Sequence, residues 1–194
     1  VYINTIGGKH TTVKAIQFKG NSNITMDNLN LNVISKDSTI SNYASASGIS
    51  MFCVNDNSFK AEKTNIEIEV KNPLKGIYAT GIDLTASKNN VVALDDTKII
   101  IKGSSENERF DVTHRGIYAT GENNTITTGK LDIDLSGEAR ANMDAYAVTV
   151  EGDGKLSTAT LGDGNISAFA KSPNDAFSVG ITVHDGAVVS KGDG

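Results

Sequence analysis

Two pairs of carboxylates lie at alternate positions of segments that have the pattern of β-strands. Asp132 and Asp134 are two residues apart, as are Glu67 and Glu69. Alternate side chains of a strand point the same way, so each pair shares one face and could supply the acid and base of a glycosidase. The same alternation is also the pattern of an ordinary strand with one solvated face. We favour this second interpretation and expect no catalytic residue.

Residues that commonly bind metals are few and widely separated. The three histidines are His10, His114 and His184, and Cys53 is the only cysteine. None of them has a neighbour at the spacing of a zinc or disulfide site, so we expect neither a metal nor a cofactor. The histidines are predicted to lie at the surface or in turns, and Cys53 is predicted to be a small buried thiol.

Gly-Asp-Gly occurs three times late in the chain, at 152–154, 162–164 and 192–194. Calcium-binding β-rolls use such glycines and aspartates, but at a strict step of nine residues. The spacing here is irregular, which favours tight turns over calcium binding.

A six-residue repeat organises the whole sequence. Gly-Ile-Tyr-Ala-Thr-Gly occurs at 76–81 and again at 116–121, and looser copies begin at Ala15, Gly48, Ala147 and Gly180. The starts are about 33, 28, 40, 31 and 33 residues apart. Repeats of this length are typical of solenoids, in which each unit is one supersecondary element.

Each repeat is predicted to hold three short strands. The hexad alternates aliphatic and polar side chains, and so does a later segment that reads Leu-Asn-Leu-Asn-Val at 29–33 and Ile-Glu-Ile-Glu-Val at 66–70. Asn-rich corners such as 89–90 and 123–124 separate the strands, because Asn tolerates left-handed turns. Apolar residues do not recur at helical steps, so the fold class is all-β.

One such unit cannot bury its apolar faces alone, but stacked units can, which predicts a parallel β-helix of about six rungs. We expect equivalent residues to form columns. Tyr78 should then lie over Tyr118 on the outside, and Glu69, Lys102 and Asp134 should alternate in charge along one outer column. The inner column is predicted to contain Ile16, Ile49, Ile77, Ile117, Val148 and Ile181.

The organisation is that of a single repeat region over 1–194. Both ends fall inside repeats, so we interpret the chain as a fragment of a longer protein. The segment 103–114 lengthens one repeat and is predicted to project as a loop.

Composition excludes two classes of partner. The net charge is −5, and no basic stripe is present, which argues against nucleic acid. No apolar run approaches the ~20 residues that a membrane-spanning helix needs, so we expect no direct membrane insertion of this segment.

The hexads, the Asn-Asn-Thr-Ile-Thr-Thr-Gly corner at 123–129 and the Leu-Asp-Ile-Asp-Leu strand at 131–135 together resemble the passenger regions of bacterial autotransporters. The resemblance covers essentially the whole chain. It implies a right-handed β-helix, export through the outer membrane and a place on the bacterial cell surface or in the secreted fraction.

The resemblance also implies a non-catalytic adhesin or stalk segment. Its partner would be a host surface protein, a host glycan or a second copy of the chain. Candidate binding residues are the predicted outward Tyr78 and Tyr118, and Arg109 and Phe110 in the segment 103–114. The alternative function is a carbohydrate-active enzyme, a polysaccharide lyase or hydrolase, on the same fold.

Overall fold

The computed structural model describes residues 1–7, 12–36, 43–71, 76–152, 157–184 and 187–191, and their regular structure is entirely β-strand. Two sheets contain the fifteen strands of these described residues. The nine strands of sheet A are β1 (Tyr2–Gly7), β3 (Asn23–Lys36), β5 (Ser58–Lys71), β7 (Val91–Ser105), β9 (Thr125–Thr128), β10 (Leu131–Ala139), β12 (Thr158–Leu161), β13 (Ile166–Lys171) and β15 (Val188–Lys191). The six of sheet B are β2 (Thr12–Gln17), β4 (Tyr43–Ser50), β6 (Gly76–Lys88), β8 (Val112–Glu122), β11 (Asn142–Gly152) and β14 (Asp175–His184).

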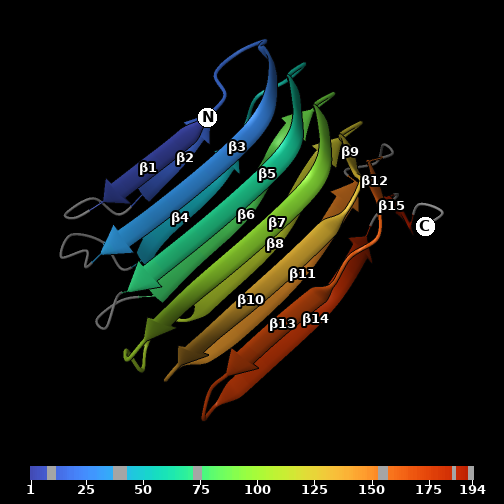
Figure 1. The fold of residues 1–194 in the computed structure, drawn as a ribbon. Helices are drawn as coiled ribbons and strands as arrows, with labels where there is room; N and C mark the ends of the chain where they lie inside the picture. The colour runs from blue at the N-terminus through green and yellow to red at the C-terminus, as the bar shows by residue number, and fades with distance from the viewer. Residues whose placement is uncertain (8–11, 37–42, 72–75, 153–156, 185–186, 192–194) are drawn as a thin grey trace.

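Every strand pairing is parallel and joins a strand to its counterpart one turn along the chain (Figure 1). In sheet B the order is β2, β4, β6, β8, β11 and β14, which is also their order in the sequence. The chain is therefore a β-solenoid of about five turns, and the parallel β-helix predicted from the sequence is confirmed.

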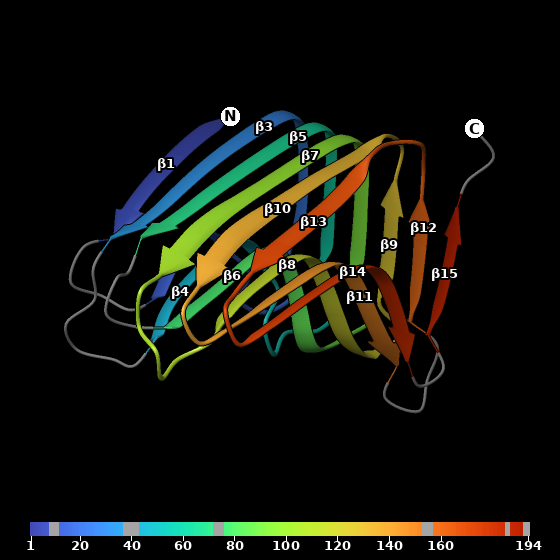
Figure 2. The ribbon, with the colours of Figure 1, turned by 90° about the horizontal axis from the view of Figure 1, so that it is seen from below.

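Three walls surround the core because sheet A is folded at a corner (Figure 2). The strands β3, β5 and β7 bend at Asp27, Glu62 and Asp95, where the pairing skips one residue. The predicted second and third strands are thus continuous in these turns. In the next two turns Gly129 and Gly162 occupy the corner, and the chain divides there into β9 and β10, then into β12 and β13.

Aliphatic side chains from successive turns form unbroken columns that are buried in the middle turns, while Ile166 and Ile181 in the last turn are exposed. The sheet A column contains Leu31, Ile66, Ile99, Ile133 and Ile166. The facing sheet B column contains Ile16, Ile49, Ile82, Ile117, Val148 and Ile181. Each fully buried side chain of this size contributes roughly 1.5–3 kcal/mol, so these columns are a main source of stability.

The two identical hexads lie on neighbouring strands but are not opposite one another. Ile82 lies opposite Ile117, while Ile77 lies opposite Val112. The prediction that Ile77 belongs to the isoleucine column is therefore wrong, as is the stacking of Tyr78 on Tyr118. Tyr78 pairs with Thr113, and Tyr118 pairs with Asp83.

A glycine column explains this register. Gly48, Gly81 and Gly116 occupy equivalent positions just before the isoleucine column, facing the isoleucines of sheet A. A Cβ on Gly81 would lie 2.6 Å from the carbonyl oxygen of Gly116 and 2.7 Å from Cγ2 of Ile99. Gly-Ile-Asp-Leu at 81–84 is thus the third repeat, and the isoleucine column then recurs at intervals of 33, 33, 35, 31 and 33 residues.

Two other sequence predictions need correction. Glu69 does lie beside Lys102, but Lys102 then pairs with Ser136 rather than Asp134, which lies opposite Ile100. The predicted loop 103–114 is also shorter. β7 continues to Ser105 and β8 begins at Val112, so only residues 106–111 connect the strands.

The Asn-rich corners form the predicted left-handed turns and also a buried ladder. Asn89 and Asn123 have φ of 55°. The next residues, Asn90 and Asn124, are buried, and Oδ1 of Asn90 accepts hydrogen bonds from the backbone N–H (3.0 Å) and Nδ2 (2.9 Å) of Asn57. Oδ1 of Asn124 accepts equivalent bonds from Asn90, so one amide per turn ties adjacent corners together.

The glycine column gives a test of the register. Gly81→Ala should lower the free energy of unfolding by about 1–3 kcal/mol, because the added methyl overfills a closed position. Gly180→Ala is the matched control, since a Cβ there meets only Cγ2 of Ile166 at 4.0 Å. Urea denaturation of both variants should show a loss for Gly81→Ala alone; equal effects would contradict the register.

Candidate functional site

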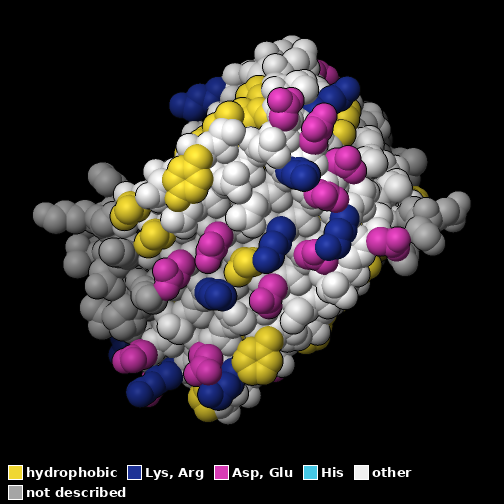
Figure 3. All heavy atoms as spheres, in the orientation of Figure 1, with side chains coloured by type: hydrophobic (Ala, Val, Ile, Leu, Met, Phe, Trp, Pro, Cys, Tyr) yellow, Lys and Arg dark blue, Asp and Glu magenta, His cyan; other side chains and the backbone are white. Residues whose placement is uncertain are grey.

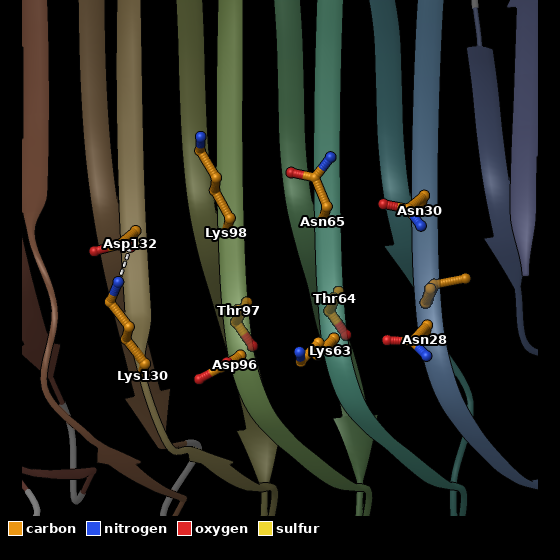
Figure 4. A pocket seen from close by; sticks show the side chains of 11 residues that line it. Asn28, Asn30, Lys63, Thr64, Asn65, Asp96, Thr97, Lys98, Lys130 and Asp132 are labelled. Atoms are coloured by element: carbon orange, nitrogen blue, oxygen red, sulfur yellow. Dashed lines mark ion pairs between the residues drawn. The ribbon is translucent and has the colours of Figure 1, made fainter.

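A groove runs across the outer face of sheet A, next to the corner at which the strands bend. Its volume is about 300 Å³, and β3, β5, β7 and β10, together with the residue preceding β10, line it. Figure 3 shows that this face carries positive and negative side chains interspersed with one another. Figure 4 shows amide, ammonium and carboxylate groups of four successive turns along the groove.

Strand alternation places these side chains. Two outward columns flank an inward column that contains Leu29, Thr64, Thr97 and Leu131, all buried. The outward column nearer the corner contains Asn28, Lys63 and Asp96, followed by Lys130. The second outward column contains Asn30, Asn65, Lys98 and Asp132.

One ion pair closes the end of the groove on β10. Nζ of Lys130 lies 3.0 Å from Oδ2 of Asp132, and the backbone N–H of Asn165 donates to Oδ1 of Asp132 at 3.0 Å. The hydrogen bond from Lys130 lowers the pKa of the Asp132 carboxyl, and the bond from Asn165 acts in the same direction. Asp132 is therefore held as an ionised, hydrogen-bonded group, which makes it a poor general acid.

The groove is suited to hydrogen bonding along an extended ligand. Successive turns lie roughly 4.8 Å apart, so donors and acceptors recur along the groove at that interval.

The two predicted acid pairs lie on outward faces of their strands. The residues that alternate with them, Ile66, Ile68, Ile133 and Leu135, are buried. Glu67 and Asp134 belong to one outward column but are separated by Ile100.

The four residues predicted to bind a partner do not line this groove. Tyr78 is exposed on the outer face of sheet B, and Tyr118 lies on the same face beneath the guanidinium of Arg115, 3.9 Å from the ring centre. Arg109 is exposed and Phe110 is half-buried in the connection 106–111. The candidates are thus divided between one sheet face and one connection.

Of the polar residues that line the groove, only Asp132 stood out in the sequence, as one member of an acid pair. Asn28, Lys63, Asp96 and Lys98 look like ordinary polar positions of separate strands. Aligning the third strands of successive repeats on their isoleucines would have placed these residues in two adjacent columns. The bend that hollows the surface beside them has no comparable sequence signal, because Asp, Glu and Gly all occupy the corner.

The histidines and the cysteine also differ from prediction. His114 is fully buried within β8, so its predicted surface position is wrong, whereas His184 is exposed as expected and His10 lies outside the described residues. Cys53 is exposed rather than buried. Among the residues that the structure describes, no group of three or more His, Cys, Asp or Glu side chains could hold a metal ion.

No protein-family model, curated protein or solved structure matches this chain. In the described parts of the chain, no helix is long and apolar enough to cross a bilayer.

His114 occupies space that two glycines leave open. A Cβ on Gly103 would lie 2.9 Å from Nε2 of His114, and one on Gly137 would lie 2.8 Å from its Cε1. Neither ring nitrogen has a hydrogen-bond partner among the described residues, and burial lowers the pKa of His114 from 6.5 to about 4. The neutral ring is therefore the form that the core accepts.

This placement predicts acid destabilisation. As the pH falls, the His114 imidazole is protonated in the unfolded chain at about pH 6.5 but in the folded chain only at about pH 4. The free energy of unfolding should therefore fall across this range, in total by on the order of 3 kcal/mol. Urea denaturation at pH 7.5 and 4.5 measures this loss, and His114→Leu should remove most of it. His184→Gln, at an exposed position, is the control; an unchanged pH dependence in His114→Leu would contradict the assignment.

Proposed function

We propose that this chain is a non-catalytic segment of an exported bacterial surface adhesin and that it binds an extended glycan along the sheet A groove. The observation that carries the proposal is the repetition of polar side chains once per turn across β3, β5, β7 and β10. A chain of sugar units also repeats its hydroxyl groups at regular intervals. Side-chain amides and charged groups fixed on rigid strands suit that pattern, because their geometry is set before the ligand binds.

A binding role is favoured over catalysis by the state of the acids. Asp132 has both carboxylate oxygens engaged, by Lys130 and by Asn165. Inverting and retaining glycosidases both need two acids that converge on one bond. Glu67 and Asp134 are not direct neighbours in their column, since Ile100 lies between them.

Surface location and adhesion are supported by the fold together with the sequence resemblance to autotransporter passenger regions. A solenoid holds its faces at fixed spacing along its axis, and such faces serve as extended binding surfaces. We therefore propose a host glycan as the partner.

The test is binding to immobilised linear oligosaccharides of neutral and acidic composition. Lys98→Ala should weaken binding about tenfold by removing one charge-assisted hydrogen bond. Lys102→Ala is the matched control, because Lys102 is an exposed lysine on the same face of β7 outside this groove.

Two results would contradict the proposal. Absence of binding to every oligosaccharide would exclude a glycan partner, and an equal loss in both lysine variants would exclude the groove. Release of new reducing or unsaturated ends during the assay would instead favour the enzyme alternative.

A further inference from the structure

A second hollow lies on the outer face of sheet A, at the C-terminal ends of the neighbouring strands β5, β7, β10 and β13 (Figure 1). It has two parts, of about 280 and 530 Å³, which share Ser104 and Glu138 and are therefore continuous. It extends from Glu69 on β5 to Pro173, just after β13. We call it the edge groove. Among the described residues, it shares no lining residue with the groove beside the corner.

Strand pairing places short side chains in the middle of the edge groove. One outward column contains Glu69, Lys102, Ser136 and Phe169, and the next contains Ser104, Glu138 and Lys171. Ser104 and Ser136 are much shorter than the side chains around them, so the surface is depressed at these two positions. Two hydroxyl groups therefore lie at the floor of the edge groove, and longer side chains form its walls.

Phe169 adds an exposed aromatic ring to these walls. It is 53% exposed, and it is the only aromatic residue among the described residues that line the edge groove. An aromatic ring has a large apolar surface, so a ligand that covers one face of the ring gains binding energy by removing that surface from water. The ring thus offers one apolar contact within a polar site.

The charges around the edge groove balance. Nζ of Lys171 lies 3.0 Å from Oε1 of Glu138, and Nη1 of Arg140 lies 3.7 Å from Oε1 of Glu108. All four side chains are more than half exposed, so they can still donate to or accept from a ligand. The lining contains three cations and three acids, namely Lys102, Arg140 and Lys171, and Glu69, Glu106 and Glu138. A site without net charge favours a neutral ligand over an ionised one.

We propose that the edge groove is a second saccharide-binding site, which takes a neutral sugar chain with one ring packed against Phe169. A pyranose ring has an apolar face of C–H groups and a rim of hydroxyl groups. The apolar face fits the Phe169 ring, and the hydroxyl groups fit the serines and the exposed ion pairs. An aliphatic peptide side chain would cover the ring but would bring no hydroxyl groups to these partners. The inference rests on the proposed function for its ligand class, but it depends on residues of its own.

A tryptophan placed at the site tests the inference. The chain contains no tryptophan, so Phe169→Trp introduces a single indole whose emission reports on a sugar ring packed against it. Cellopentaose and chitopentaose are the neutral probes, and pentagalacturonic acid is the acidic one. A neutral probe should cause a saturable shift of the emission, and the acidic probe should cause a smaller one.

Phe177→Trp is the matched control. Phe177 is 50% exposed and lies in the same turn, but on β14 of sheet B. Its emission should not change with any of the three probes. An equal shift in both tryptophan variants, no shift with either neutral probe, or a larger shift with pentagalacturonic acid would overturn the inference.

The two sites fail separately. Lys98→Ala in the Phe169→Trp chain should leave the emission shift intact, because Lys98 does not line the edge groove. Lys102 does line it, so Lys98→Ala and Lys102→Ala are compared in a Phe169→Ala chain, where binding reports on the groove beside the corner. Binding that depends on Lys98, with no emission shift in Phe169→Trp, would overturn this inference and leave the proposed function standing.

Discussion

The structure depends on parallel pairing between equivalent strands of successive turns. One turn of three short strands cannot bury its apolar side chains, and its backbone donors and acceptors point along the solenoid axis. Both requirements are met only when the next turn repeats the same geometry. The amino acid that fits at a position therefore depends on the residue one turn away as much as on its neighbours in sequence. The Asn57–Asn90–Asn124 ladder and the Gly48–Gly81–Gly116 column are two examples of this requirement.

The sequence predicted the fold but not its register, and the reason is physical. Alternation of apolar residues determines which side chains point inward, and that alternation is clear in every turn. The register depends instead on which glycine allows close approach to the next turn. The identical sequences at 76–81 and 116–121 suggested that Ile77 lies opposite Ile117. The contacts of Gly81 and Ile82 instead place Ile82 opposite Ile117. His114 was misplaced for a related reason, because Gly103 and Gly137, which make room for its ring, are distant in sequence.

The same stacking generates the candidate surface on sheet A. On sheet A it places Asn28, Lys63 and Asp96 in one line beside a bend, which forms a groove of regularly spaced polar groups. The groove is not visible in any single repeat, since it consists of residues from several successive turns.

Disulfide trapping between β6 and β8 tests the register most directly. In a Cys53→Ser background, Thr80→Cys is combined with either Arg115→Cys or Thr120→Cys. The structure pairs Thr80 with Arg115, so this combination should oxidise readily, because paired strands bring Cα atoms within the ~4.4–6.8 Å that a disulfide spans. Alignment of the two identical hexads would instead pair Thr80 with Thr120, about five residues or ~16 Å farther along the strand. Rapid crosslinking of Thr80→Cys with Thr120→Cys, and none with Arg115→Cys, would contradict the account.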